Sequence, residues 1–95
     1  MNIENIRCFI SLAECLNFTR AAAREHITQT AMSRKISALE KELDVVLLYR
    51  DTRQVELTSA GNEFYPKAKE LVRLYDDTVQ QLQHPQHEFL APLKL

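Results

Sequence analysis

The sequence predicts a mainly α-helical fold: three helices and a two-stranded β-hairpin, followed by one long helix. The 95 residues include one Gly and three Pro, which are too few chain breakers for an all-β sandwich with its many turns. Apolar residues recur at helical spacing in several segments, and one short stretch shows strand-like alternation instead. With 45% hydrophobic residues, a chain of this length can bury one small core and forms a single domain.

The first two helices are predicted over residues 3–16 and 18–25. Asn17 separates them, and its side chain can accept hydrogen bonds from the free amides that begin the second helix. The second segment is rich in Ala, a strong helix former, and is about two turns long. The apolar stripe of the first helix, at spacings of three and four, consists of Ile3, Ile6, Phe9, Ile10, Ala13 and Leu16.

A third helix is predicted over residues 29–43, between an N-cap at Thr28 and a C-terminal end at Asp44. Its apolar side chains fall within about 60° of arc and form the buried face; they are Met32, Ile36, Leu39 and Leu43. The opposite face is polar and rich in donors, and carries Thr30, Ser33, Arg34, Ser37 and Lys41. A short helix joined by a tight turn to a longer one is the helix-turn-helix unit, whose second helix fits the DNA major groove.

Strands are predicted over residues 45–49 and 55–57, where the apolar pattern changes period. The polar segment 50–54 between them is turn-like and places Arg50 and Arg53 near the tip of a hairpin. These two arginines could contact the flanking DNA backbone or a narrow minor groove.

The last helix is predicted over residues 59–83, with Thr58 as its N-cap. Gly61, in its first turn, is interpreted as a site of close packing. At about 1.5 Å per residue this helix is nearly 40 Å long, more than the remaining domain can cover. We therefore expect the second half of its apolar stripe to pair with a second copy of the chain; the dimerisation residues are Leu71, Tyr75, Val79 and Leu82.

The polar face of the third helix suits sequence reading. Arg34 can make two parallel hydrogen bonds to a guanine edge, and Gln29 can pair with adenine. Thr30 can touch a thymine methyl group or a phosphate, and the first-turn amides can meet phosphates. The predicted DNA-contacting residues are Thr19, Arg20, Thr28, Gln29, Thr30, Ser33, Arg34, Lys35, Ser37, Arg50 and Arg53.

The charge distribution fits a local DNA surface. The net charge is −1, so the chain is not basic overall. Residues 19–53 nevertheless hold seven basic and five acidic side chains, whereas residues 54–95 hold four basic and six acidic ones. The acidic share therefore lies mainly in the long helix and the tail, away from the proposed DNA surface.

Other classes of function find little support. Catalytic triads, glycine-rich phosphate loops and paired-carboxylate clefts are not evident, and we expect no enzyme. His84 and His87 have no third ligand nearby, which favours a solvated linker over a metal site. Cys8 and Cys15 are about 10 Å apart along a helix, too far for a disulfide. Reduced thiols and the absence of a membrane-length apolar run predict a soluble cytoplasmic domain.

Across residues 1–83 the sequence closely resembles the N-terminal domain of LysR-type transcriptional regulators. No single matching fragment is specific for this family, but all of them in one register make a specific match. The matching fragments are Phe18-Thr19-Arg20-Ala21-Ala22, Thr28-Gln29, Ser33-Arg34-Lys35-Ile36, Leu39-Glu40-Lys41-Glu42-Leu43, Arg50 with Arg53, and Leu57-Thr58-Ser59-Ala60-Gly61.

The resemblance implies a winged helix-turn-helix over residues 1–58 and a linker helix over 59–83 that pairs antiparallel with its twin. Residues 84–95 would be a hinge and the first strand of an effector-binding domain that senses a small molecule. No cofactor is expected within residues 1–95. The implied partners are an interrupted DNA palindrome, a second copy in a homodimer, further copies in a full-length tetramer and RNA polymerase. The implied location is the bacterial cytoplasm, in association with the nucleoid.

Three positions depart from the family pattern. Thr30 stands where Pro is usual, which adds a hydroxyl and can alter base preference. Asp44 stands where Gly is usual, so the end of the third helix is expected to be strained. Residues 54–56, Gln-Val-Glu, make the wing less basic than in many relatives.

Two other functions remain open at this level. Arg34 and Lys35 alone would be interpreted as a solvated helix face, and a winged-helix module could use that face to dock another protein. Such a module predicts weak, salt-insensitive DNA association that does not depend on Arg34. A purely helical dimerisation element is disfavoured, because it would not need a hairpin with Arg50 and Arg53.

Overall fold

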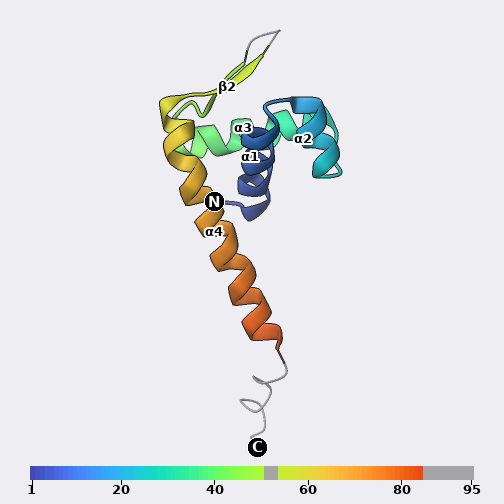
Figure 1. The fold of residues 1–95 in the computed structure, drawn as a ribbon, viewed down its shortest axis with the longest axis vertical. Helices are drawn as coiled ribbons and strands as arrows, with labels where there is room; N and C mark the ends of the chain where they lie inside the picture. The colour runs from blue at the N-terminus through green and yellow to red at the C-terminus, as the bar shows by residue number, and fades with distance from the viewer. Residues whose placement is uncertain (51–53, 85–95) are drawn as a thin grey trace, which may run out of the picture.

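The computed structural model describes residues 1–50 and 54–84. Three helices and a hairpin form a compact head, from which a long helix extends (Figure 1). This mainly helical arrangement confirms the predicted fold class. The elements are α1 (Ile3–Cys15), α2 (Phe18–Arg24), α3 (Gln29–Leu43), β1 (Leu48–Arg50), β2 (Val55–Leu57) and α4 (Ser59–Gln83).

Each helix begins at a side chain that accepts a backbone amide hydrogen bond. The Asn17 side chain accepts from the amide of Arg20 at 2.9 Å, and Thr28 accepts from Ala31 at 3.0 Å. Thr58 accepts from the amide of Gly61 at 3.0 Å. All three predicted caps are therefore confirmed, and they fix where the helices start.

Left-handed residues end two of the helices. Leu16 (φ 50°) follows α1, which stops at Cys15, one residue short of the predicted end. Asp44 (φ 58°) follows α3, as predicted for a position where glycine is the easier residue. A third left-handed residue, His26 (φ 59°), lies in the turn between α2 and α3.

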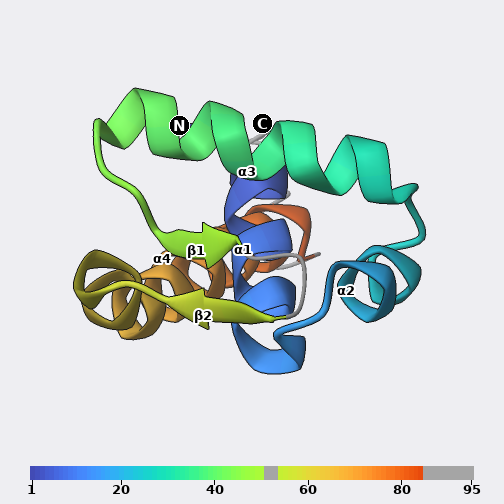
Figure 2. The ribbon, with the colours of Figure 1, turned by 90° about the horizontal axis from the view of Figure 1, so that it is seen from above.

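The core lies where α1 meets the other helices. Phe9 is fully buried, and its ring lies 5.2 Å from that of Phe64 on α4. From the opposite side α3 crosses the head (Figure 2) and contributes Met32, Ile36 and Leu39, all fully buried. These contacts fix α3 along its length and leave its opposite face toward solvent.

The hairpin differs from its predicted boundaries. β1 begins at Leu48, so the prediction of a strand from Val45 was wrong, and Arg50 belongs to the strand instead of the turn. The reason is that tertiary partners use the backbone before the strand. The amides of Leu47 and Leu48 donate to the Glu40 carboxylate at 2.8 and 3.3 Å, and the carbonyl of Leu47 accepts from the amide of Thr58 at 3.0 Å.

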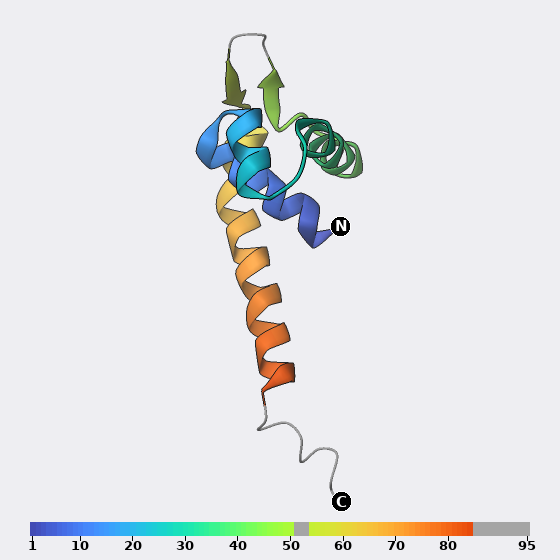
Figure 3. The same cartoon turned by 90° about the vertical axis from the view of Figure 1, so that its right-hand side faces the viewer.

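The start of α4 packs tightly against this connection. A Cβ atom on Gly61 would lie 2.2 Å from the carbonyl oxygen of Leu47, which confirms the close packing predicted there. Farther along, Ala68 is fully buried, and Phe64 and Val72 pack against the core. The second half of α4 extends beyond the head (Figure 3). Within the described residues, no helix is both long enough and apolar enough to cross a lipid bilayer.

Candidate nucleic-acid interface

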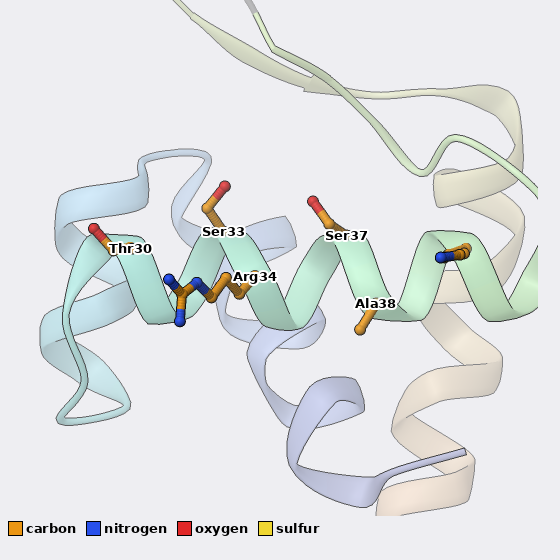
Figure 4. Close-up of a pocket in the computed structure, with 6 residues that line it drawn as sticks. Thr30, Ser33, Arg34, Ser37 and Ala38 are labelled. Carbon is orange, nitrogen blue, oxygen red and sulfur yellow. The ribbon is translucent and has the colours of Figure 1, made fainter.

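The outer face of α3 forms a shallow groove, shown in Figure 4. The groove gathers four side chains predicted to contact DNA: Thr30, Ser33, Arg34 and Ser37. Its lining residues are Thr30, Ser33, Arg34, Ser37, Ala38 and Lys41. None of these side chains is acidic. Arg34 supplies five N–H donors in a rigid fork, and the hydroxyl groups both donate and accept, so this surface can bond base edges and phosphate oxygens.

A second hollow lies where the starts of α2 and α3 meet the end of β1. It is lined by Phe18, Gln29, Thr30, Ser33 and Arg50. Beside it the Gln29 side-chain amide donates to the Thr19 hydroxyl, which joins two predicted site residues from different helices. The hollow adjoins the groove, because Thr30 and Ser33 line both.

Arg50 ends β1 and pairs with Val55, near the hairpin tip as predicted, and its side chain contacts α3. Its guanidinium bonds the Glu40 carboxylate at 3.0 Å and donates to the Ser37 hydroxyl at 3.4 Å. It also lies 5.7 Å from the centre of the Phe18 ring, within cation–π range. Arg50 thus links the wing to both helices of the helix-turn-helix unit.

The remaining predicted contacts have different surroundings. The Thr28 hydroxyl accepts from the amide of Ala31 as the α3 cap, and Arg20 is exposed on α2. Lys35 is half-buried, and its position on the helix places it beside the buried face formed by Met32 and Ile36. Arg53 lies outside the described residues.

Sequence reasoning missed three residues of this surface, Phe18, Ala38 and Glu40, and placed Lys41 on the polar face without including it among the DNA-contacting residues. Lys41 had a usable signal, because Thr30, Arg34, Ser37 and Lys41 follow one another at spacings of four, three and four on one helical face. The role of Glu40 had no signal in the sequence, because its partners lie seven to ten residues away, in β1 and in the connection that leads into it.

The cysteines show no sign of a functional site. Cys8 and Cys15 are not in a disulfide, as predicted, and burial raises the pKa of the Cys8 thiol to about 11. A buried thiol with that pKa is a poor nucleophile. No group of three or more potential metal ligands occurs among residues 1–50 and 54–84, which include His84 but not His87.

A different surface lies along α4. Met1, Ile3 and Ile6 from the start of the chain line an apolar groove together with Leu71, Leu74 and Tyr75. Of the predicted dimerisation residues, Leu71, Tyr75 and Leu82 are exposed and Val79 is half-buried. Leu74, which the prediction omitted, is 65% exposed. This groove therefore presents large apolar side chains to solvent.

The sequence matches a known family of regulators. The model of the family described as "Bacterial regulatory helix-turn-helix protein, lysR family" matches residues 3–62. The chain belongs to the LysR family. Its helices, two-stranded wing and long α4 have the winged helix-turn-helix and linker-helix fold that the resemblance implied.

Curated relatives agree with this LysR-family assignment. The transcriptional regulator BudR of Raoultella terrigena is 45% identical over 76 residues, which cover 80% of this chain and 26% of BudR. The transcriptional activator IlvY of Haemophilus influenzae is 36% identical over 95 residues, covering 100% of this chain and 32% of IlvY. The chain thus spans between a quarter and a third of the length of these two regulators.

Solved structures show the same fold. The CbnR DBD–DNA complex has a TM-score of 0.81 at 37% identity and covers 85% of this chain and 93% of that one. The complex of BenM DBD with catB site 1 DNA has a TM-score of 0.79, also at 37% identity, and covers 85% and 90%.

Proposed function

We propose that this LysR-family domain reads double-stranded DNA with α3 in the major groove. The single observation that carries the proposal is the α3 groove, which aligns Thr30, Ser33, Arg34 and Ser37 on one solvent-facing side of a helix. A major groove about 12 Å wide admits one helix, and its base edges are read by such donors and acceptors. The DNA complexes formed by CbnR and BenM, which share this fold, support the same role here. The role is binding and not catalysis.

The residues divide by the part of DNA that they suit. Arg34 and Gln29 are proposed to read base edges, and Thr30, Ser33 and Ser37 to contact bases or phosphates. Thr19, Arg20 and the first-turn amides of α3, after Thr28, are proposed to meet phosphates. Lys35 is assigned a phosphate contact at the edge of the surface, and Arg50 and Arg53 are assigned flanking contacts from the wing.

We also propose that the domain acts as a homodimer through α4. The apolar side chains of Leu71, Leu74, Tyr75 and Leu82 are exposed in one chain, and a second copy of α4 with the same stripe would cover them. Residues 1–58 then form the DNA-reading unit and 59–83 the dimerising linker. A twofold dimer places two α3 helices on an interrupted palindrome.

The family supplies the wider setting of the proposal. In the full-length regulator, residues 84–95 would lead into an effector-binding domain that takes a small molecule. The full-length protein would form tetramers, contact RNA polymerase and act in the bacterial cytoplasm.

The test is selection of bound duplexes from a random pool, at two salt concentrations, with Arg34→Ala in parallel. We expect an enriched palindrome, steep loss of binding with salt, and relaxed preference at one base pair in Arg34→Ala. Loss of the bidentate contact should weaken binding by about 1–3 kcal/mol. Arg73→Ala is the matched control, because Arg73 is an exposed arginine on α4, away from the α3 groove.

Other outcomes point to other functions. Salt-dependent binding without an enriched sequence would leave a nonspecific DNA binder. Absence of binding at low salt would contradict the proposal and favour the protein-docking module. Equal losses in Arg34→Ala and Arg73→Ala would mean that total charge, and not base reading by α3, controls affinity.

A further inference from the structure

Glu40 is an acidic side chain at the edge of a surface proposed to bind a polyanion. Its side chain is only 15% exposed. One carboxylate oxygen accepts from the amides of Leu47 and Leu48, at 2.8 and 3.3 Å. The other bonds the Arg50 guanidinium at 3.0 Å. Glu40 therefore ties α3 both to the connection that leads into the wing and to the first strand of the wing.

Within residues 1–50 and 54–84, the bonds to Arg50 leave several of its N–H donors available. Among the described residues, two of its five N–H donors are bonded, one to Glu40 and one to the Ser37 hydroxyl. The side chain also lines the hollow shared with Phe18, Gln29, Thr30 and Ser33. A planar guanidinium can bond a carboxylate along one edge and a phosphate along another.

The hollow has further features that suit an anion. It lies at the N-terminus of α3, a helix of 15 residues whose first amides and dipole favour negative charge. The Ser33 and Thr30 hydroxyls on its wall can donate to oxygen. The Phe18 ring, 5.7 Å from the Arg50 guanidinium, limits how far that group can swing away.

We propose that this hollow takes one backbone phosphate of DNA, with Arg50 as its ligand and Glu40 as the positioning residue that fixes Arg50. The inference rests on the proposed DNA binding and assigns a role to an acidic residue that simple electrostatics would count as unfavourable. Glu40 sets the geometry of the contact and does not touch the DNA.

The direction in which one substitution changes DNA affinity distinguishes a positioning role of Glu40 from a simple effect of its charge. Glu40→Gln removes a negative charge near DNA, so charge alone predicts tighter binding. The glutamine oxygen can still accept from the two backbone amides, but its amide group faces Arg50 as a donor and no longer holds it. The positioning role therefore predicts weaker binding.

The experiment measures the affinity of the chain for one selected duplex, by fluorescence anisotropy, across a series of salt concentrations. The variants are Glu40→Gln, Arg50→Gln and the double substitution, with Glu56→Gln as the matched control. Glu56 lies exposed on β2, and its side chain bonds Gln54 instead of Arg50. We expect both single variants at the hollow to bind about tenfold more weakly and to lose about 0.9 from the magnitude of the salt slope, as for one phosphate contact.

The double substitution is expected to bind no more weakly than Arg50→Gln, because Glu40 acts through Arg50. Glu56→Gln should bind as tightly as the wild type or slightly more tightly. Circular dichroism melts of each variant report folding separately. If Glu40→Gln fails to fold, Arg50→Lys replaces it: the lysine keeps the charge but lacks the fork, and binding several-fold weaker than wild type supports the inference.

Three results would overturn the inference. Glu40→Gln could bind as tightly as wild type or more tightly, its loss could add to that of Arg50→Gln, or Arg50→Lys could match the wild type. Failure of the proposed function looks different, because the wild-type chain itself would then bind no duplex, and the inference would fall with it.

Discussion

The outer face of α3 and the second half of α4 are both exposed, yet their chemistry is opposite. The α3 groove presents hydroxyl groups, Arg34 and Lys41, and α4 presents Leu74 and Leu82 at 65% and 68% exposure. Polar groups on α3 are already solvated and can exchange water for base edges. Apolar groups on α4 gain free energy when a partner covers them. This difference in chemistry is the one we expect if α3 contacts DNA and α4 contacts a second protein chain.

The two helices also differ in how they are held. α3 is fixed along its length by Met32, Ile36 and Leu39, all fully buried, so its outer side chains keep a constant register. α4 is buried only in its first half, at Gly61 and Ala68, and its second half is held to α1 by the exposed ion pair of Asp76 with Arg7. A reading surface needs that rigidity, whereas an interface between two copies can gain its own order on assembly.

The largest expected effect tests the apolar side of the comparison. Leu74→Glu places a charge in the proposed dimer interface twice, once per subunit, and each loses about 1.5 kcal/mol or more of apolar burial. We expect the dimer dissociation constant to rise about 100-fold, measured by sedimentation equilibrium. Gln80→Glu is the control, because Gln80 lies about 180° around α4 from Leu71. An unchanged dimer in Leu74→Glu would contradict the assignment.

The next effect tests how α4 is joined to the connection after α3. In Gly61→Ala the new Cβ would lie 2.2 Å from the carbonyl oxygen of Leu47, so the backbone must shift. We expect a loss of about 2 kcal/mol in the free energy of unfolding, as for other overpacked sites, measured by urea denaturation. Asn62→Ala, an exposed neighbour, should change stability far less. A Gly61→Ala variant as stable as wild type would show that this contact is loose.

A smaller effect tests the polar link between the head and α4. The Glu14 carboxylate accepts from the Tyr65 hydroxyl on α4 and pairs with Arg24 on α2. These partners hold the pKa of Glu14 below its ordinary value of 4.5. A lowered folded-state pKa contributes stability above the unfolded-state value, and this is lost as pH falls through the folded-state value.

Glu14→Gln should therefore be less stable than wild type at pH 7, by less than about 1 kcal/mol because the groups are partly exposed. The difference should shrink as pH falls below 4.5. Melting temperatures from pH 2 to 7 check this, with Glu63→Gln as the control on α4. A difference that stays constant with pH would mean that the carboxylate charge is not involved.

The smallest effect is a gain in stability at the end of α3. Asp44 adopts φ 58°, a conformation that glycine reaches without strain. We expect Asp44→Gly to raise the free energy of unfolding by about 0.5 kcal/mol, because relief of strain is partly offset by greater freedom of the unfolded chain. Thermal melts measure it, and DNA affinity should stay unchanged. A loss of stability would show that the aspartate side chain stabilises the helix end.

Features that depend on residues within one helical turn could be predicted from the amino-acid sequence alone. The caps at Asn17, Thr28 and Thr58 need only a side chain and an amide two or three residues on. The buried and polar faces of α3 follow from the 3.6-residue period, which is why Thr30, Ser33, Arg34 and Ser37 could be placed together on one face from their spacing.

Contacts between elements that are distant in the sequence became evident only in the tertiary structure. Glu40 bonds the backbone before β1 and so delays the strand predicted from Val45. The same carboxylate bonds the Arg50 side chain and holds it against α3. Local propensity and periodicity carry no information about such contacts, because these depend on the angles at which the helices pack and on which distant polar groups they bring within hydrogen-bonding distance.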